Sequence, residues 1–195
     1  MAKQHATNPD LASRIEDLEM QYFKIRTELA ALRSRLEPVD CHQGYVFTAT
    51  GGRKVSIGDV FGRDVELVII HSMGESSSYS TLWCDGFNGL TAHIETRCAF
   101  VVVSDDPPEV QAEQAQRRSW NFRMLSSVGT TFQSDLGFGN AAGSGLGAST
   151  FLKKPDGRVA HYASTQFGPG DPFCAAWHLF DLLPEGEHNW RPRLI

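Results

Sequence analysis

The chain has 195 residues, of which 41% are hydrophobic and 21% are charged, so it is long enough for one substantial core and too short for two. Its formal net charge of −5 gives no general attraction to nucleic-acid phosphates or to anionic lipid, and we expect neither as a partner. No segment approaches the roughly 18 apolar residues of a membrane-spanning helix, and the start of the chain lacks the apolar core of a secretion signal. These features predict a cytoplasmic protein.

The first 38 residues predict one long helix. Asn8, Pro9 and Asp10 form a typical helix start, with a side-chain cap, a proline in the first turn and an early acidic residue. Pro38 closes the segment, because the residue before a proline avoids the helical conformation. Apolar residues recur at alternating spacings of four and three: Leu11, Ile15, Leu18, Tyr22, Ile25, Leu29, Leu32 and Leu36. Either the body of the protein or a second copy must cover this stripe, and we expect a homodimer.

From residue 39 onward the pattern changes to that of an α/β domain. The segment YVFTATGGRKVSI predicts a hairpin around Gly51 and Gly52. The runs VELVII (65–70) and CAFVVV (98–103) have the composition of parallel strands that are buried on both faces, and residues 78–95 between them predict a helix. A second helix is expected over 107–119, capped by Asp105 and Asp106.

The remainder of the chain completes this domain. A glycine-rich stretch, 136–147, predicts a loop beside a pocket. The turn Pro155-Asp156-Gly157 joins STFLK to RVAHYAS as an antiparallel hairpin, and DPFCAAWHLFDLL predicts a last helix capped by Asp171. This order of elements predicts a thioredoxin-like fold over residues 39–195, with a central mixed sheet flanked by helices.

The turn after the first central strand is the place where this fold would carry a reactive group. A thiol redox site needs sulfur at the N-terminus of the helix, where exposed N–H groups stabilise a thiolate. Here the turn reads Ser77-Ser78-Tyr79-Ser80. If Ser77 and Ser80 occupy the two positions of a CxxC pair, disulfide exchange is excluded there, because a hydroxyl cannot form a mixed disulfide.

Over nearly its whole length the chain resembles the thioredoxin-like family known as domain of unknown function 899. The matching segments are ELAALRSRL, GYVFTATGGRKVSIGDVFGR, IIHSMG, LWCDGFNGL, SWNFRMLSSVGTTFQSD and AWHLFDLLPEGEHNW. The resemblance implies a CxxC-type pair ahead of a WxDGFNG motif, and counting back from Trp83 places that pair at Ser77 and Ser80. A thioredoxin also carries a cis proline facing the pair, where this chain reads Gly147-Ala148-Ser149. Both departures argue against dithiol activity.

Two further residues are candidates beside this turn. His71 ends the first central strand and is placed to act as a general base or ligand, although a hydrogen-bonded core histidine is the alternative. Thr81 and Cys84 have the T-x-x-C spacing that resembles the peroxidatic motif of peroxiredoxins, although a buried structural cysteine is the alternative. We expect His71, Ser77, Ser80 and Cys84 to line one pocket over residues 71–84.

Three functions remain open from the sequence. The first is binding or transformation of a small organic molecule without a dithiol, with serine hydroxyls and the helix N-terminus holding an oxyanion or a carbonyl oxygen. The second is a single-thiol peroxidase or reductase that uses Cys84, and the third is a non-catalytic dimeric interaction module. The four cysteines are scattered and no short ligand spacing occurs, so we expect free thiols, no metal and no cofactor.

Overall fold

The computed structural model describes residues 8–139 and 145–194, and residues 140–144 of the predicted glycine-rich loop lie outside them. The chain divides into two compact units, Met1–Glu37 and Pro38–Ile195. Within the described ranges, none of the helices has both the length and the apolar character needed to span a bilayer.

The first unit is the helix α1 (Pro9–Arg33). The Asn8 side chain accepts hydrogen bonds from the backbone N–H groups of Asp10 and Leu11 at 3.0 and 3.2 Å, which confirms the predicted start. The predicted end is wrong: the helix stops at Arg33, and Leu36 lies outside it. Ser34 donates from its hydroxyl to the Ala31 carbonyl at 2.8 Å, and such local side-chain bonds compete with helix continuation.

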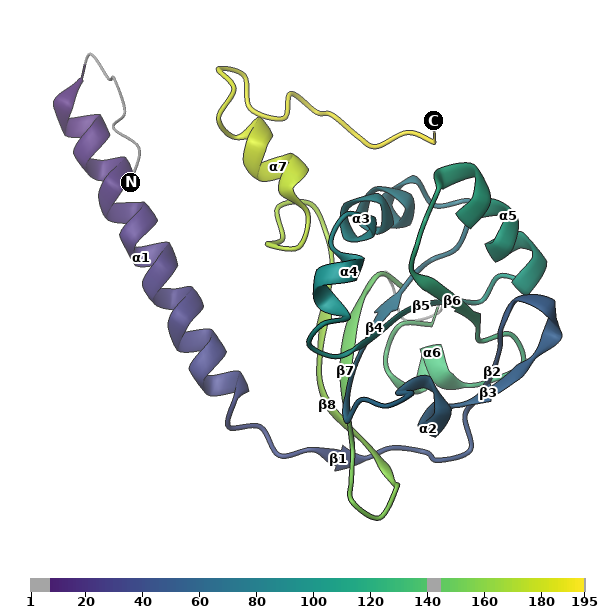
Figure 1. Ribbon diagram of the computed structural model, residues 1–195. Coiled ribbons are helices and arrows are strands. Elements are labelled where there is room, and N and C mark those ends of the chain that lie inside the picture. Colours follow the sequence, from purple (N-terminus) through teal and green to yellow (C-terminus); the bar gives the residue numbers. More distant parts are fainter. Residues whose placement is uncertain (1–7, 140–144, 195) are drawn as a thin grey trace. The chain divides into compact units, whose positions relative to one another are not determined.

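The second unit is built on one mixed sheet, whose described strands follow the order β1-β8-β7-β4-β5-β6-β2-β3 (Figure 1). β4, β5 and β6 are parallel, and the other neighbours are antiparallel. The strands are β1 (Val39–Asp40), β2 (Val46–Thr48), β3 (Lys54–Ser56), β4 (Glu66–His71), β5 (Ala99–Ser104), β6 (Arg123–Ser126), β7 (Gly147–Lys153) and β8 (Val159–Gln166).

The strands agree with most of the sequence prediction. The β2–β3 and β7–β8 hairpins and the parallel β4–β5 pair are confirmed. The third parallel strand, β6, was not predicted. Its sequence RMLS is short and has polar residues at both ends, so it lacks the apolar run that marks β4 and β5.

The helices of this unit are shorter than predicted. The expected helix over 78–95 is two helices, because the chain leaves the first at Gly89. The described helices are α2 (Ile57–Val60), α3 (Ser78–Asn88), α4 (Thr91–Ile94), α5 (Pro108–Arg118), α6 (Phe132–Asp135) and α7 (Ala175–Phe180), with a 3-10 turn η1 (Thr50–Gly52).

Two predicted helix caps are also wrong. Pro107 precedes α5 and Cys174 precedes α7, and neither helix has a side-chain cap. Asp106 instead accepts from the Glu75 N–H at 2.9 Å, which ties the loop after β4 to the loop after β5. Asp171 accepts from Gly168 N–H at 2.8 Å and so closes a turn ahead of α7.

Residues alternate between the two faces of the sheet and create two cores. Ile69 of β4 joins the core that contains Ile57 of α2 and Phe132 of α6. Ile70, the next residue, joins the core that contains Trp83 of α3 and residues of α7. Figure 1 shows α2 and α6 on one side of the strands and α3 and α5 on the other. The loop after β4 therefore leads from the sheet into α3.

We predict that Gly147→Ala destabilises the protein by about 1–3 kcal/mol. An added Cβ would overlap the Phe138 ring and the Thr165 carbonyl oxygen, which leave no room at the start of β7. The matched control is Gly86→Ala in α3, where nothing lies within 4 Å, and this change should stabilise by roughly 0.5–1 kcal/mol. Urea unfolding of both variants measures the difference, and equal effects would show that β7 tolerates a side chain here.

Candidate functional site

Ser77 and Ser80 lie close together at the turn between β4 and α3. Ser77 is the N-cap of α3, and its hydroxyl accepts from the Ser80 N–H at 3.1 Å. Ser80 is buried, and its hydroxyl accepts from the Met73 N–H at 2.8 Å. The two hydroxyls therefore hold the turn to the helix.

Cys84 lies one turn further along α3, inside the core shared with Trp83. Its side chain is fully buried, and burial raises the pKa of the thiol to about 12. Thr81, the partner expected from the T-x-x-C spacing, donates its hydroxyl to the Ser77 carbonyl at 3.0 Å. Burial likewise raises the thiol pKa of the other cysteines: Cys41, Cys98 and Cys174.

His71 lies on the opposite face of the sheet from α3. Its ring stacks on Phe138, with ring centroids 3.8 Å apart, and it also stacks on Phe132 of the α6 core. The expected single pocket containing His71 with Ser77, Ser80 and Cys84 is therefore not formed. The reason is the strand period of two, since Ile70 already occupies the α3 side at this level of β4.

The two ring nitrogens of His71 belong to a buried chain of polar side chains. Nδ1 bonds to Oε1 of Gln133, and Nε2 bonds to the Ser149 hydroxyl at 2.7 Å. The chain continues from Ser149 to Ser164 and from Ser164 to Nε2 of His161, both at 2.7 Å. An amide carbonyl only accepts, so Nδ1 carries the proton and Nε2 accepts from Ser149. Sequence reasoning missed this chain because its members come from three strands and α6.

The order serine, histidine and amide is similar to that of a hydrolase triad, but this arrangement cannot perform the same chemistry. The Gln133 side chain is neutral and provides no carboxylate to stabilise an imidazolium. Ser149 is fully buried, so no substrate carbonyl can reach it. Burial also lowers the pKa of His71 to about 4, which keeps the ring neutral near pH 7. We therefore assign His71 to the core.

A small polar cavity of about 120 Å³ opens at the carboxyl ends of β4 and β5, and Gln133 and Phe138 form its inner wall. Asp105 and Asp106 also line it, but their oxygens accept from Ser127 and from Glu75 N–H. In the described part of the chain, no three histidine, cysteine or acidic residues are grouped to hold a metal ion.

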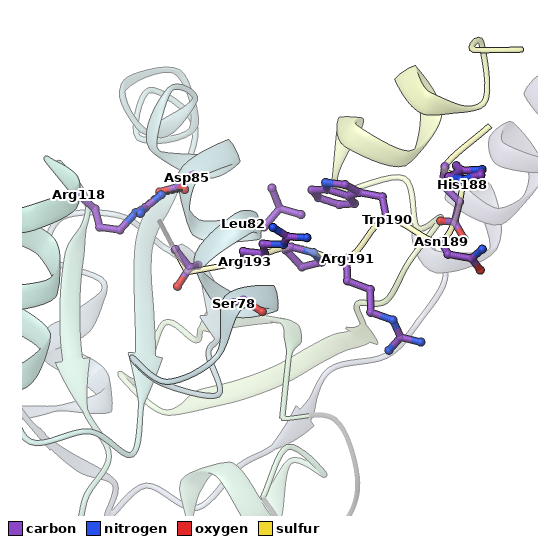
Figure 2. A pocket seen from close by; sticks show the side chains of 12 residues that line it. Ser78, Leu82, Asp85, Arg118, His188, Asn189, Trp190, Arg191 and Arg193 are labelled. Carbon is purple, nitrogen blue, oxygen red and sulfur yellow. Dashed lines mark hydrogen bonds and ion pairs between the residues drawn. The ribbon is translucent and has the colours of Figure 1, made fainter. Parts of the chain in front are cut away.

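A larger hollow than this polar cavity lies beside α3. It has a volume of about 980 Å³, and α3, the end of α5 and the C-terminal segment 187–193 form its walls (Figure 2). We call this hollow the α3 groove. Its lining residues are Ser78, Thr81, Leu82, Asp85, Arg118, Glu187, His188, Asn189, Trp190, Arg191, Pro192 and Arg193.

Both walls of the α3 groove are anchored. Arg118 pairs with Asp85 through two hydrogen bonds, one of them 3.0 Å long, and this pairing raises the pKa of the guanidinium. On the other wall, Trp190 packs edge-to-face on Trp177 and on Phe180, with centroid distances of 5.6 and 4.9 Å. Figure 2 shows the paired Asp85 and Arg118 on one side and Trp190 on the other.

A second hollow of about 330 Å³ adjoins the α3 groove, because Thr81 and Arg118 line both. Arg117 lines this hollow and pairs with Glu75. Across residues 8–139 and 145–194, Arg191 and Arg193 have no hydrogen bond or ion pair. Sequence reasoning gave no role to this C-terminal segment, and the signal that was available was the run RPR after Trp190.

The family model for a bacterial protein of unknown function, DUF899, matches residues 12–193. The chain belongs to the DUF899 family. This confirms the resemblance drawn from the sequence segments. Comparison with curated protein sequences found no match.

The solved structures similar to this DUF899 chain have low sequence identity to it. Reduced Prx3 of Vibrio vulnificus in complex with hydrogen peroxide has a TM-score of 0.51 at 14% identity, over 69% of this chain and 88% of that one. A peroxiredoxin-like protein from Aquifex aeolicus has a TM-score of 0.49 at 20% identity, over 67% and 76%. Peroxidoxin BcpB of Mycobacterium tuberculosis has a TM-score of 0.45 at 20% identity, over 68% and 86%. The DUF899 chain has a thioredoxin-like fold.

We predict that His71 makes the DUF899 protein less stable in mild acid. Its folded pKa near 4 is below the unfolded value near 6.5, so the unfolded state binds the proton first. This contribution is complete above pH 6.5 and is lost as the pH falls toward 4, a change of about 3 kcal/mol. Urea unfolding between pH 4 and 7 should show the slope.

The comparison variants are His71→Gln and His93→Gln. His71→Gln should flatten the slope relative to wild type, although the burial-depressed pKa of His161 contributes a remaining part of it. His93 is exposed, and its replacement should leave the slope unchanged. A wild-type slope in His71→Gln would show that His71 is not the group responsible.

Proposed function

We propose that this DUF899 protein binds a small organic anion in the α3 groove and does so without dithiol chemistry. The observation that carries the proposal is a groove of about 980 Å³ in which Arg191 and Arg193 have no partner within the described residues. Guanidinium groups match carboxylates and phosphates in geometry and charge.

The charges around the groove favour an anion. Arg117 is paired with Glu75 and Arg118 with Asp85, so the two opposite charges within each pair cancel. The lining then retains two further arginines, Arg191 and Arg193, and one further acidic residue, Glu187. The protein as a whole has a net charge of −5, so this excess of positive charge is local. Ser78, in the first turn of α3, adds the favourable end of the helix dipole.

The size and walls of the groove favour an organic ligand over an inorganic ion. Small-molecule sites have volumes of roughly 300–1,000 Å³, and this groove lies at the upper end of that range. Leu82 and Trp190 provide apolar surface beside the two arginines. A ligand with a carboxylate or phosphate group and an apolar part would satisfy both kinds of contact.

Ser77 and Ser80 support the non-dithiol part of the proposal. Each hydroxyl accepts a backbone N–H, a role that needs no redox chemistry, and neither can exchange disulfides. They fix the first turn of α3, which forms one wall of the groove through Ser78. In this view, the two serines position the binding site.

We predict that Arg193→Gln weakens ligand binding about tenfold or more, because a hydrogen bond to a charged group contributes roughly 1.5–3 kcal/mol. The measurement is a thermal-shift screen of small organic carboxylates and phosphates, with their neutral amides and esters as matched compounds, followed by calorimetry of the hits. Arg63→Gln, an exposed arginine outside the groove, is the control. Equal binding of neutral and anionic compounds, or no effect of Arg193→Gln, would contradict the proposal.

The anion-binding proposal and the single-thiol alternative make opposite predictions for Cys84, and the proposal predicts an unreactive thiol. With a pKa near 12, on the order of one thiol in 10⁵ is ionised at pH 7, and the side chain is buried. Brief treatment with hydrogen peroxide and dimedone should therefore leave Cys84 unlabelled in the folded protein and label it in urea. Mass spectrometry reads the result. Labelling of Cys84 in the folded protein would favour a peroxidase or reductase.

A further inference from the structure

We propose that α1 forms a parallel, two-stranded coiled coil with α1 of a second copy of this chain. This inference concerns assembly and is independent of ligand binding in the α3 groove. It rests on an apolar seam that a single helix cannot bury by itself and on the charges beside that seam.

The seam consists of the apolar residues of α1 at alternating spacings of four and three. Those on the helix are Leu11, Ile15, Leu18, Tyr22, Ile25, Leu29 and Leu32. No residue of α1 is buried, and every seam side chain except that of Ile15 is 44–63% exposed to solvent. Burial of one leucine side chain is worth about 1.5–3 kcal/mol, so pairing two such seams gains considerable stability. The spacing is that of the a and d positions of a heptad, which pack against a partner helix.

The charged residues that flank the seam fit a parallel, in-register pair. In that arrangement each g position contacts the e position five residues later on the other helix. Arg14 and Glu28 occupy g positions, and Glu19 and Arg33 occupy e positions. Arg14 therefore faces Glu19 of the partner subunit, and Glu28 faces Arg33 of the partner subunit. In the remaining pair, a neutral residue, Gln21, faces a charged one, Arg26 of the partner subunit. Symmetry repeats each contact, and no like charges meet.

An antiparallel pair fits less well. The alignment that sets Tyr22 opposite Ile25 of the partner subunit leaves Leu11 without a seam residue of the helix opposite it. Its only attractive flanking contact is Glu19 with Arg26 of the partner subunit. Glu28 would then face a neutral glutamine. The parallel arrangement keeps every seam layer and both kinds of opposite-charge contact.

The first test measures the mass of the full-length protein by light scattering after gel filtration. We expect a dimer. In a dimer of the Arg14→Glu variant, two glutamates meet at each of the two symmetric contacts. In a dimer of the Glu19→Arg variant, two arginines meet there. Each variant should therefore weaken the dimer about tenfold or more. An equimolar mixture of the two variants should form heterodimers, in which both contacts are attractive again. Circular dichroism of each variant checks that the helix content is retained.

The second test is a cross-link that depends on alignment. Leu18→Cys places a thiol at a d position, which meets its own counterpart only in a parallel, in-register pair. Mild oxidation should produce a disulfide-linked dimer, whereas Met20→Cys, outside the seam, should not. A monomeric wild-type protein would overturn the proposal. So would a trimer, or a dimer that responds neither to charge reversal nor to Leu18→Cys.

Discussion

The strand β4 and its period of two determine which side chains lie beside the turn into α3. Because β4 is buried on both faces, Ile70 faces the helix α3 and His71 faces the opposite core. The histidine is thereby removed from the turn that follows it and joined to Gln133 and Ser149 instead. What remains beside α3 is a surface of hydroxyls and guanidinium groups, and the proposed binding of an anion rests on these groups.

The sequence was sufficient to predict the elements that carry strong local signals. The apolar runs of β4 and β5 predicted parallel strands, and Pro155-Asp156-Gly157 predicted the β7–β8 hairpin. Ser77 and Ser80 were expected in the turn that leads into the helix after β4, and the structure has Ser77 as the cap of α3 with Ser80 in its first turn. Local spacing was enough for these predictions.

Features that depend on contacts distant in the sequence could not be predicted in the same way. The bond between His71 and Gln133 spans 62 positions, and nothing in either local sequence indicates it. The α3 groove depends on Trp190 packing on Trp177 and Phe180, which holds the last residues beside α3. Asp106 has the sequence context of a helix cap, yet its carboxylate accepts a hydrogen bond from the Glu75 N–H and does not cap α5.

The anchoring of Trp190 on α7 has a consequence for biosynthesis. One wall of the groove consists of residues 187–193, which the ribosome adds after every strand of the sheet has been made. A nascent chain interrupted just before Trp190 would contain the strands of the sheet and most of both cores, and yet would lack one wall of the α3 groove. Such a shortened product would pass for a folded protein by its spectrum while being unable to bind the anion proposed for the groove.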